Sequence, residues 1–307
     1  MQRVRFMTWC SSCVSGMHLP AFAAAETGLF AELGLEVEFV ACPANLARVR
    51  AVATGHADVA LTSVSELLAA QTEAAGRLPV RFLATAHQRN PIAGVVREDS
   101  DLRTPTDLPG ARTARWSMPG YAQEYAGALD YMGLGAPVMI DTPGDLDPAM
   151  GSGDIDVIPV WMDDTTRARL RGMTLHHRGA DFGVRVIPLD IPVYSTGLVA
   201  ADRLPSELIC RMRDALVAGY ELQRRQPEPG LAAFRRHFPD ISEEHACVNW
   251  ALFEPYAFDG VPPGTMDAER WEETIAYTAK THRLSLFPGD LIYRPELLAP
   301  AREHTTA

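Results

Sequence analysis

Strand-like and helical segments alternate through the first two thirds of this sequence, and no other feature restricts its possible folds as strongly. Apolar runs at residues 4–9, 35–40, 58–61 and 80–86 are typical of buried strands, and segments with a helical pattern separate them. Successive strands joined by helices form mostly parallel sheets. We therefore expect an α/β fold with parallel-rich sheets and helices on both faces of each sheet.

The order of the segments predicts two domains. A second group of strand-like runs begins near residue 93, and the last third of the chain has a helical pattern. We predict a discontinuous first lobe over residues 1–90 and 200–307 and a second lobe over residues 91–199, with hinge crossings near 90 and 199. A cleft between two such lobes is a usual ligand site. The sequence shows no internal repeat.

Five stretches of the sequence resemble the periplasmic solute-binding proteins for sulfonates, taurine, nitrate and thiamine precursors. The stretches are HLPAFAAAETGLFAELGLEVEFV, VRAVATGHADVALTSVSELLAA, GVVREDSDLRTPTDLPGARTA, MGSGDIDVIPVW and STGLVAADRLPSELICRMRDAL, and together they extend over nearly the whole chain. The resemblance implies the two-lobed type II periplasmic-binding-protein fold. It also implies hinge closure on a small-molecule ligand, an organic anion or a heterocycle, that is delivered to an ABC-type importer.

Two groups of enzymes share that architecture, and the resemblance to them leaves an enzymatic function open. Pyrimidine synthases of fungal thiamine biosynthesis carry a lysine that binds pyridoxal phosphate after the third strand, with a histidine shortly after it. Thr62 and Glu66 occupy those positions here, so no Schiff base forms and we expect no cofactor. Aromatic sulfinate desulfinases carry a nucleophilic cysteine after the first strand, near the place of Cys10 and Cys13.

Cys10 and Cys13 admit three interpretations. One thiol is a nucleophile for C–S cleavage or decarboxylation of an aromatic acid, with His18 as its partner. Alternatively the pair serves redox chemistry or binds a metal, but a zinc site needs about four ligands and we expect none. In the third interpretation both thiols only line the cleft. The five cysteines are odd in number and scattered, which indicates a reducing compartment rather than a disulfide framework.

Two predicted helix starts offer backbone N–H groups to a ligand. Ser63 precedes one helix with Glu66 at capping-box spacing, and Ser117 precedes the other. Free N–H groups at a helix start hold carboxylate, sulfonate or phosphate groups, although simple capping is an equally good explanation. The predicted binding residues at these starts are Thr62, Ser63, Glu66, Ser117, Gly120 and Tyr121.

Aromatic and charged side chains near strand ends complete the predicted site. Trp116 and Trp161 end strands of the second lobe, where an aromatic ring can hold a flat or cationic ligand. Arg89 is placed to clamp an anion, near the first crossing. The alternative role for the two tryptophans is packing beneath the interdomain seam, and the alternative for Arg89 is a solvated charge at the hinge. The remaining predicted binding residues are Trp9, His87, Arg89, Trp116, Trp161, Asp163 and Tyr194.

Charge and hydropathy restrict the partners. The net charge is −11 and no run is rich in Lys or Arg, which argues against a nucleic-acid partner. The longest apolar runs fall well short of the roughly 20 residues that a membrane span needs, so we expect no membrane insertion. No signal-peptide pattern precedes the first strand, which predicts a cytoplasmic protein as the sequence stands, or a periplasmic protein or lipoprotein if a leader was removed. A receptor would have an ABC permease as its partner.

Overall fold

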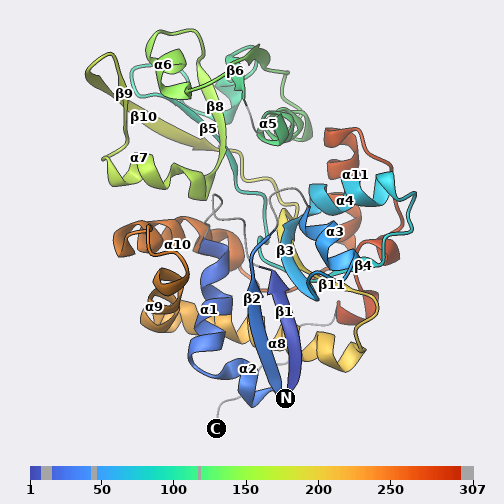
Figure 1. Ribbon diagram of the computed structural model, residues 1–307. Helices are drawn as coiled ribbons and strands as arrows, with labels where there is room; N and C mark the ends of the chain where they lie inside the picture. The colour runs from blue at the N-terminus through green and yellow to red at the C-terminus, as the bar shows by residue number, and fades with distance from the viewer. Residues whose placement is uncertain (8–15, 43–46, 117–118, 299–307) are drawn as a thin grey trace. The chain divides into compact units, whose positions relative to one another are not determined.

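The computed structural model describes residues 1–7, 16–42, 47–116 and 119–298, and the structural statements below concern these residues. The chain divides into two compact units (Figure 1): unit 1 comprises Met1–Arg89, Val193–Ala279 and Leu284–Ala307, and unit 2 comprises Asn90–Pro192 and Lys280–Arg283. The second boundary lies before the expected position near residue 199, because the whole of β11 (Thr196–Ala201) pairs within the unit 1 sheet.

Unit 1 is built on a five-stranded sheet in the order β2-β1-β3-β11-β4. β1 pairs with β2 and β3 in parallel, whereas β11 is antiparallel to both of its neighbours. Val4 and Phe6 of β1 are buried while Arg3 is exposed, the alternation expected of a strand. The strands are β1 (Gln2–Met7), β2 (Leu35–Val40), β3 (Val59–Ser63), β4 (Val80–Thr85) and β11.

The helices of unit 1 include a close pair in which α1 packs against α8. A β-carbon at Gly219 of α8 would stand 2.3 Å from the carbonyl oxygen of Pro20, so only glycine permits this approach. The helices are η1 (Gly16–His18), α1 (Leu19–Glu26), α2 (Leu29–Glu32), α3 (Arg48–Ala53), α4 (Val64–Glu73), α8 (Ser206–Arg225), α9 (Pro227–His237), α10 (Glu243–Ala257), α11 (Ala268–His282), η4 (Gly289–Leu291) and η5 (Pro295–Leu297).

Unit 2 is built on a six-stranded sheet in the order β7-β6-β8-β5-β10-β9. β6 is parallel to β7 and β8, and the other pairs are antiparallel. The elements are β5 (Ile92–Arg97), η2 (Pro105–Asp107), β6 (Arg112–Arg115), α5 (Pro119–Tyr131), β7 (Val138–Asp141), α6 (Leu146–Gly151), β8 (Val157–Trp161), η3 (Met162–Thr165), α7 (Thr166–Leu170), β9 (Thr174–His177) and β10 (Ala180–Pro188).

The two sheets confirm the predicted α/β class, although both are mixed rather than uniformly parallel. Unit 2 has a core cluster in which Val95, Ala114, Met150, Ile155 and Val184 are buried together. Burial of such side chains is the main source of folding free energy. None of the helices in the described ranges has both the length and the apolar composition needed to cross a bilayer.

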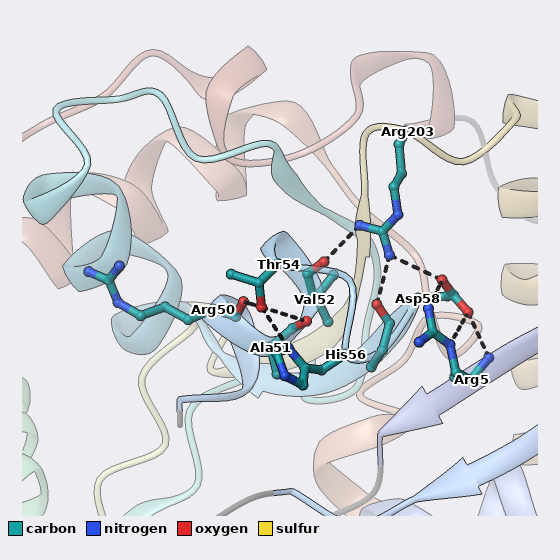
Figure 2. Close-up of polar contacts among 9 residues, drawn as sticks. Arg5, Arg50, Ala51, Val52, Thr54, His56, Asp58 and Arg203 are labelled. Carbon is teal, nitrogen blue, oxygen red and sulfur yellow. Dashed lines mark hydrogen bonds and ion pairs between the residues drawn. The ribbon is translucent and has the colours of Figure 1, made fainter. Parts of the chain in front are cut away.

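Asp58, which precedes β3, ties three segments of unit 1 together (Figure 2). The backbone N–H, Nε and Nη2 of Arg5 in β1 donate to its carboxylate at 2.9, 3.1 and 3.0 Å. Arg203, just after β11, donates to Asp58 at 3.1 Å and to the carbonyl oxygens of Val52 and Ala57 at 2.8 and 2.9 Å. The end of α3 is thereby fixed to the sheet.

Unit 2 repeats this arrangement with Arg112 and Asp156. The backbone N–H, Nε and Nη2 of Arg112 donate to Asp156 at 2.8, 2.9 and 2.6 Å. The preceding helices α3 and α6 also end alike, because Gly55 and Gly153 follow them with φ angles of 83° and 77°. In the sequence, the two places share a Gly-x-x-Asp-Val pattern.

Candidate functional site

The carboxyl edge of the unit 2 sheet gathers three predicted binding residues. β6 and β8 are parallel, so their last residues lie at one edge. Trp116 directly follows β6, Trp161 is the last residue of β8, and Tyr121 lies in the first turn of α5. Residues that are far apart in the sequence are therefore brought together by the strand order.

Tyr121 is the central ring of this group. Its centroid lies 5.8 Å from that of Trp116, at 67°, and 5.5 Å from that of Trp161, at 30°. Both separations are in the range of favourable ring contacts. The Nε1 atom of Trp116 is buried and has no acceptor within the described part of the chain. We call Trp116, Tyr121 and Trp161 the aromatic cluster.

Glu124 lies beneath the aromatic cluster, one helical turn after Tyr121. Its carboxylate accepts a hydrogen bond of 2.8 Å from Nε1 of Trp161 and one of 2.6 Å from Nδ2 of Asn90. The Oδ1 atom of Asn90 in turn accepts a hydrogen bond of 2.9 Å from the backbone N–H of Ile92. Burial raises the pKa of Glu124, and the two donors act against that rise. The glutamate thus fixes the orientation of the Trp161 ring.

Further carboxyl groups border Tyr121 from the turn after β8. Asp163 is buried, and Asp164 accepts a hydrogen bond of 3.3 Å from the backbone N–H of Trp161. Burial raises the pKa of Tyr121, and so do the nearby Asp164, Asp163 and Glu124. The phenol therefore stays protonated. The edge combines flat apolar rings with groups that accept hydrogen bonds.

His87 lies at the carboxyl edge of the unit 1 sheet, just after β4. It is 1% exposed, and its Nδ1 lies 2.7 Å from the Thr196 hydroxyl. The ring also packs 4.9 Å from Phe253 of α10. Burial lowers the pKa of His87 to about 3, so the imidazole is neutral near pH 7. It therefore cannot supply the positive charge that an anionic ligand would favour.

Arg89 and Tyr194 are both engaged by other parts of unit 1. The guanidinium of Arg89 lies 4.8 Å from the ring centroid of Tyr256 and 3.5 Å from the carboxylate of Asp259. Tyr194 is buried, its ring lies 5.0 Å from that of Trp271, and its hydroxyl accepts the backbone N–H of Asp267. These contacts favour structural roles for both residues.

The start of α4 shows which of its predicted residues are committed to the fold. Ser63 caps the helix by accepting the backbone N–H of Glu66 at 3.1 Å. The Glu66 carboxylate does not complete the capping box but binds Arg48, and it accepts the backbone N–H of Val49 at 3.2 Å. Thr62 is fully buried at the end of β3, and its hydroxyl has no partner within the described ranges.

The other predicted site residues give less information about a ligand site. Trp9, Cys10, Cys13 and Ser117 lie outside the described residues, so the nucleophile hypothesis stays a prediction. His18 is buried at the start of α1, while Gly120 is exposed at the start of α5 with open space at its α-carbon.

Sequence reasoning missed the polar residues that support the aromatic cluster. Glu124 had one available signal, its i,i+3 spacing from Tyr121 within a predicted helix, which places both on one helix face. Asn90 had none, because its amide reaches Glu124 only through the tertiary fold. Ser195, buried before β11 with no partner for its hydroxyl in the described part of the chain, was missed as well.

Two shallow hollows of about 310 and 380 Å³ lie at the opposite edge of the unit 2 sheet, where β5 ends and β6 begins. Two of their carboxylates are already engaged: Asp99 binds Arg97, and Asp156 binds Arg112. Phe182 is the only aromatic residue among the described residues that line them, and none of these lining residues has a buried side-chain N or O atom without a hydrogen-bond partner. We therefore place the candidate site at the aromatic cluster.

Known proteins resemble this chain over most of its length. A formylaminopyrimidine-binding protein of Halalkalibacterium halodurans is 24% identical over 280 residues, which cover 86% of this chain and 81% of the relative. The periplasmic aliphatic sulphonate binding protein SsuA of Escherichia coli matches with a TM-score of 0.69 and 18% identity, over 96% of this chain and 93% of that one. The desulfurization enzyme DSZB matches with a TM-score of 0.57 and 15% identity, over 97% and 98%.

The structural matches establish the fold, and they agree with the periplasmic-binding-protein architecture expected from the sequence. Both a binding protein and an enzyme are among them, so the fold alone does not decide the function. A family model described as NMT1/THI5 like matches residues 15–229, which is more than half of the sequence. The chain therefore belongs to the NMT1/THI5-like family.

Proposed function

We propose that this protein is the solute-binding component of an ABC-type importer and that its solute is a flat heterocycle bearing N–H donors. The observation that carries the proposal is the position of Tyr121, whose ring packs against both Trp116 and Trp161. Such rings provide broad, rigid surfaces against which a planar ligand can stack. Ligand sites typically combine such surfaces with a few polar groups that fix orientation.

The charges around the aromatic cluster favour this solute class over a sulfonate. Three carboxyl groups act on Tyr121, from Asp164, Asp163 and Glu124. Carboxyl oxygens accept hydrogen bonds from amino groups and ring N–H groups, and any of these carboxyl groups that is ionised repels an anion. The indole N–H of Trp116 supplies one donor for a ring nitrogen or carbonyl of the solute. An aminopyrimidine has this combination of a flat ring, N–H donors and acceptor nitrogens.

The relatives support the same proposal. One is named for binding a formylaminopyrimidine and another for binding an aliphatic sulphonate in the periplasm. We extend from them the coarse role, uptake of a small molecule from the periplasm with a permease as partner. Closure about a hinge on solute binding stays a prediction, and a decrease in the radius of gyration on adding the solute would support it.

Isothermal titration calorimetry with a formylaminopyrimidine, the corresponding aminopyrimidine and ethanesulfonate tests the proposal. We expect binding of the pyrimidines and weak or no binding of ethanesulfonate. Trp161→Ala should weaken pyrimidine binding by about 30-fold, since a lost ring contact and the lost apolar surface together remove about 2 kcal/mol. Tyr131→Ala is the control, because it removes an aromatic ring that is 37% exposed at the last residue of α5, the helix that carries Tyr121 near its start.

The opposite ranking of ligand affinities would contradict the proposed solute class. If ethanesulfonate bound tightly and neither pyrimidine did, the carboxyl groups would not govern selection at this edge. Uptake measurements with labelled pyrimidine, in cells that contain or lack the protein, test the importer role separately. Uptake that does not depend on the protein would contradict that role even if binding were confirmed.

A further inference from the structure

The carboxyl edge of the unit 1 sheet contains two buried hydroxyl groups that the fold does not use. The hydroxyls of Thr62 and Ser195 make no hydrogen bond within the described part of the chain. Thr62 is 0% exposed and Ser195 is 4% exposed. A buried, unpaired hydroxyl destabilises a protein, so its presence calls for an explanation outside the fold itself.

Both hydroxyl-bearing residues adjoin the first turn of α4. Thr62 directly precedes Ser63, the residue that caps this helix. The carbonyl oxygen of Ser195 accepts a hydrogen bond of 2.8 Å from the backbone N–H of Val64, the first residue of α4. Thr62 and Ser195 therefore belong to one small region, built from the end of β3 and the approach to β11. The positive end of a helix dipole favours an electron-rich group there.

The neighbouring side chains of this region are already satisfied. The Ser63 hydroxyl accepts the backbone N–H of Glu66 at 3.1 Å, and the Glu66 carboxylate is held by Arg48. The Nδ1 atom of His87 lies 2.7 Å from the Thr196 hydroxyl, and the imidazole is neutral near pH 7. The region thus presents hydroxyl donors without a compensating net charge, which suits a neutral acceptor such as a carbonyl oxygen better than a strong anion.

We infer that the start of α4 is a binding site for a carbonyl-type acceptor of a small solute, with the Thr62 and Ser195 hydroxyls as its donors. The inference rests on the proposed function only in taking the same class of solute. It explains why two hydroxyls are kept in a place where apolar groups would be more stable. These two hydroxyls lower the stability of the unliganded protein, and they provide the donors that recognise the solute.

Two measurements on Thr62→Val and Ser195→Ala test the inference. The first is thermal unfolding without solute, where removing an unused hydroxyl should raise Tm by about 1–4 °C. The second is the affinity for a formylaminopyrimidine, which should fall about 3- to 10-fold for each variant, the usual effect of one lost hydrogen bond. Affinity for the aminopyrimidine that lacks the formyl oxygen should change less than 2-fold.

Two further variants separate recognition from general effects on folding. Thr62→Ser keeps the hydroxyl and should keep the wild-type affinity. Tyr220→Phe removes another buried hydroxyl of unit 1 that has no partner in the described ranges. It should therefore raise Tm without changing affinity, which makes it the matched control for an unused hydroxyl away from α4.

The results distinguish failure of the inference from failure of the proposed function. If wild type binds the pyrimidines and both variants bind them equally well, the inference is overturned while the function stands. If wild type binds neither pyrimidine, the proposed function fails, and the unfolding data decide the inference. A Tm below that of wild type for Thr62→Val would show that the fold itself uses the hydroxyl, which would overturn the inference; a higher Tm would support it.

Discussion

The carboxylate of Asp58 accepts three hydrogen bonds from a single residue, Arg5, through its backbone N–H and two guanidinium nitrogens (Figure 2). Burial alone would raise the pKa of Asp58, but the bonds from Arg5 and Arg203 outweigh it and hold that pKa below its usual range. Arg112 and Asp156 make the same three bonds in unit 2. In each unit the contact joins a strand to the start of its neighbour.

Asp58→Asn should reduce the free energy of unfolding by about 2–4 kcal/mol, because it leaves two guanidinium groups without their carboxylate. Asp156→Asn should cost about 1 kcal/mol. Two features account for the difference: Asp58 has a second guanidinium partner in Arg203, and its side chain is 13% exposed whereas that of Asp156 is 32% exposed. Urea unfolding followed by circular dichroism measures both. Equal losses would show that burial does not set the strength of this contact.

His87 should make the protein sensitive to acid. Its pKa is about 3 in the folded state, whereas an unfolded histidine titrates near 6.5. The unfolded state therefore binds more protons between these values, and stability falls as the pH decreases below about 6.5. Between pH 7 and pH 4.5 the linkage amounts to about 2–3 kcal/mol.

His87→Gln removes this titration, so its free energy of unfolding should depend less on pH than that of wild type. The comparison is the change from pH 7 to pH 4.5 in each protein, measured by urea unfolding. Taking the difference between the two proteins cancels other groups that titrate in the same range. Parallel pH profiles would mean that His87 has the same pKa in the folded and the unfolded protein, which would contradict this prediction.

Ser63→Ala should reduce stability by about 1 kcal/mol through loss of the α4 cap, and it should leave solute affinity unchanged. The Ser63 hydroxyl is occupied by the backbone N–H of Glu66 at 3.1 Å, so we assign it to the helix rather than to the solute. Thermal unfolding and calorimetry on the same preparation measure both quantities. A loss of affinity larger than the loss expected from partial unfolding would show that Ser63 contributes to solute binding.

The sequence was sufficient for those parts of the fold and the candidate site that depend on local pattern. The apolar run at residues 80–86 predicts β4, and Ser63 with its following helical pattern predicts the start of α4. The same reasoning places Trp116 and Trp161 at strand ends, because strand ends are visible as the end of an apolar run. Hydrophobic periodicity and capping act over a few residues, which is why they can be read directly.

The features that the sequence did not reveal all depend on contacts between distant segments. Glu66 has the spacing of a capping box, yet its carboxylate binds Arg48 because α3 lies close to α4 in the fold. Tyr194, a predicted binding residue, is buried against Trp271. Asn90 reaches Glu124 across 34 positions of sequence. A local rule gives the groups that are available, and the tertiary fold decides which partners they find.

Glu124 should control the aromatic cluster through the orientation of Trp161. In Glu124→Gln, the side chain has one acceptor oxygen for two donors, Nε1 of Trp161 and Nδ2 of Asn90, so one donor faces the new amide group. We expect a shift in tryptophan fluorescence and a loss of about 10-fold in heterocycle affinity.

The same variant makes a prediction about pH whose sign is opposite to that for His87. The pKa of Glu124 is raised by burial, so the folded carboxyl holds its proton to a higher pH than the unfolded one. Wild type therefore loses stability as the pH rises from the usual carboxyl range through the raised pKa, whereas glutamine has no such loss. The stability of Glu124→Gln relative to wild type should increase from pH 4 to pH 8, as measured by urea unfolding. A relative stability that stays constant over this range would show that Glu124 ionises normally and that its charge is fully compensated by Trp161 and Asn90.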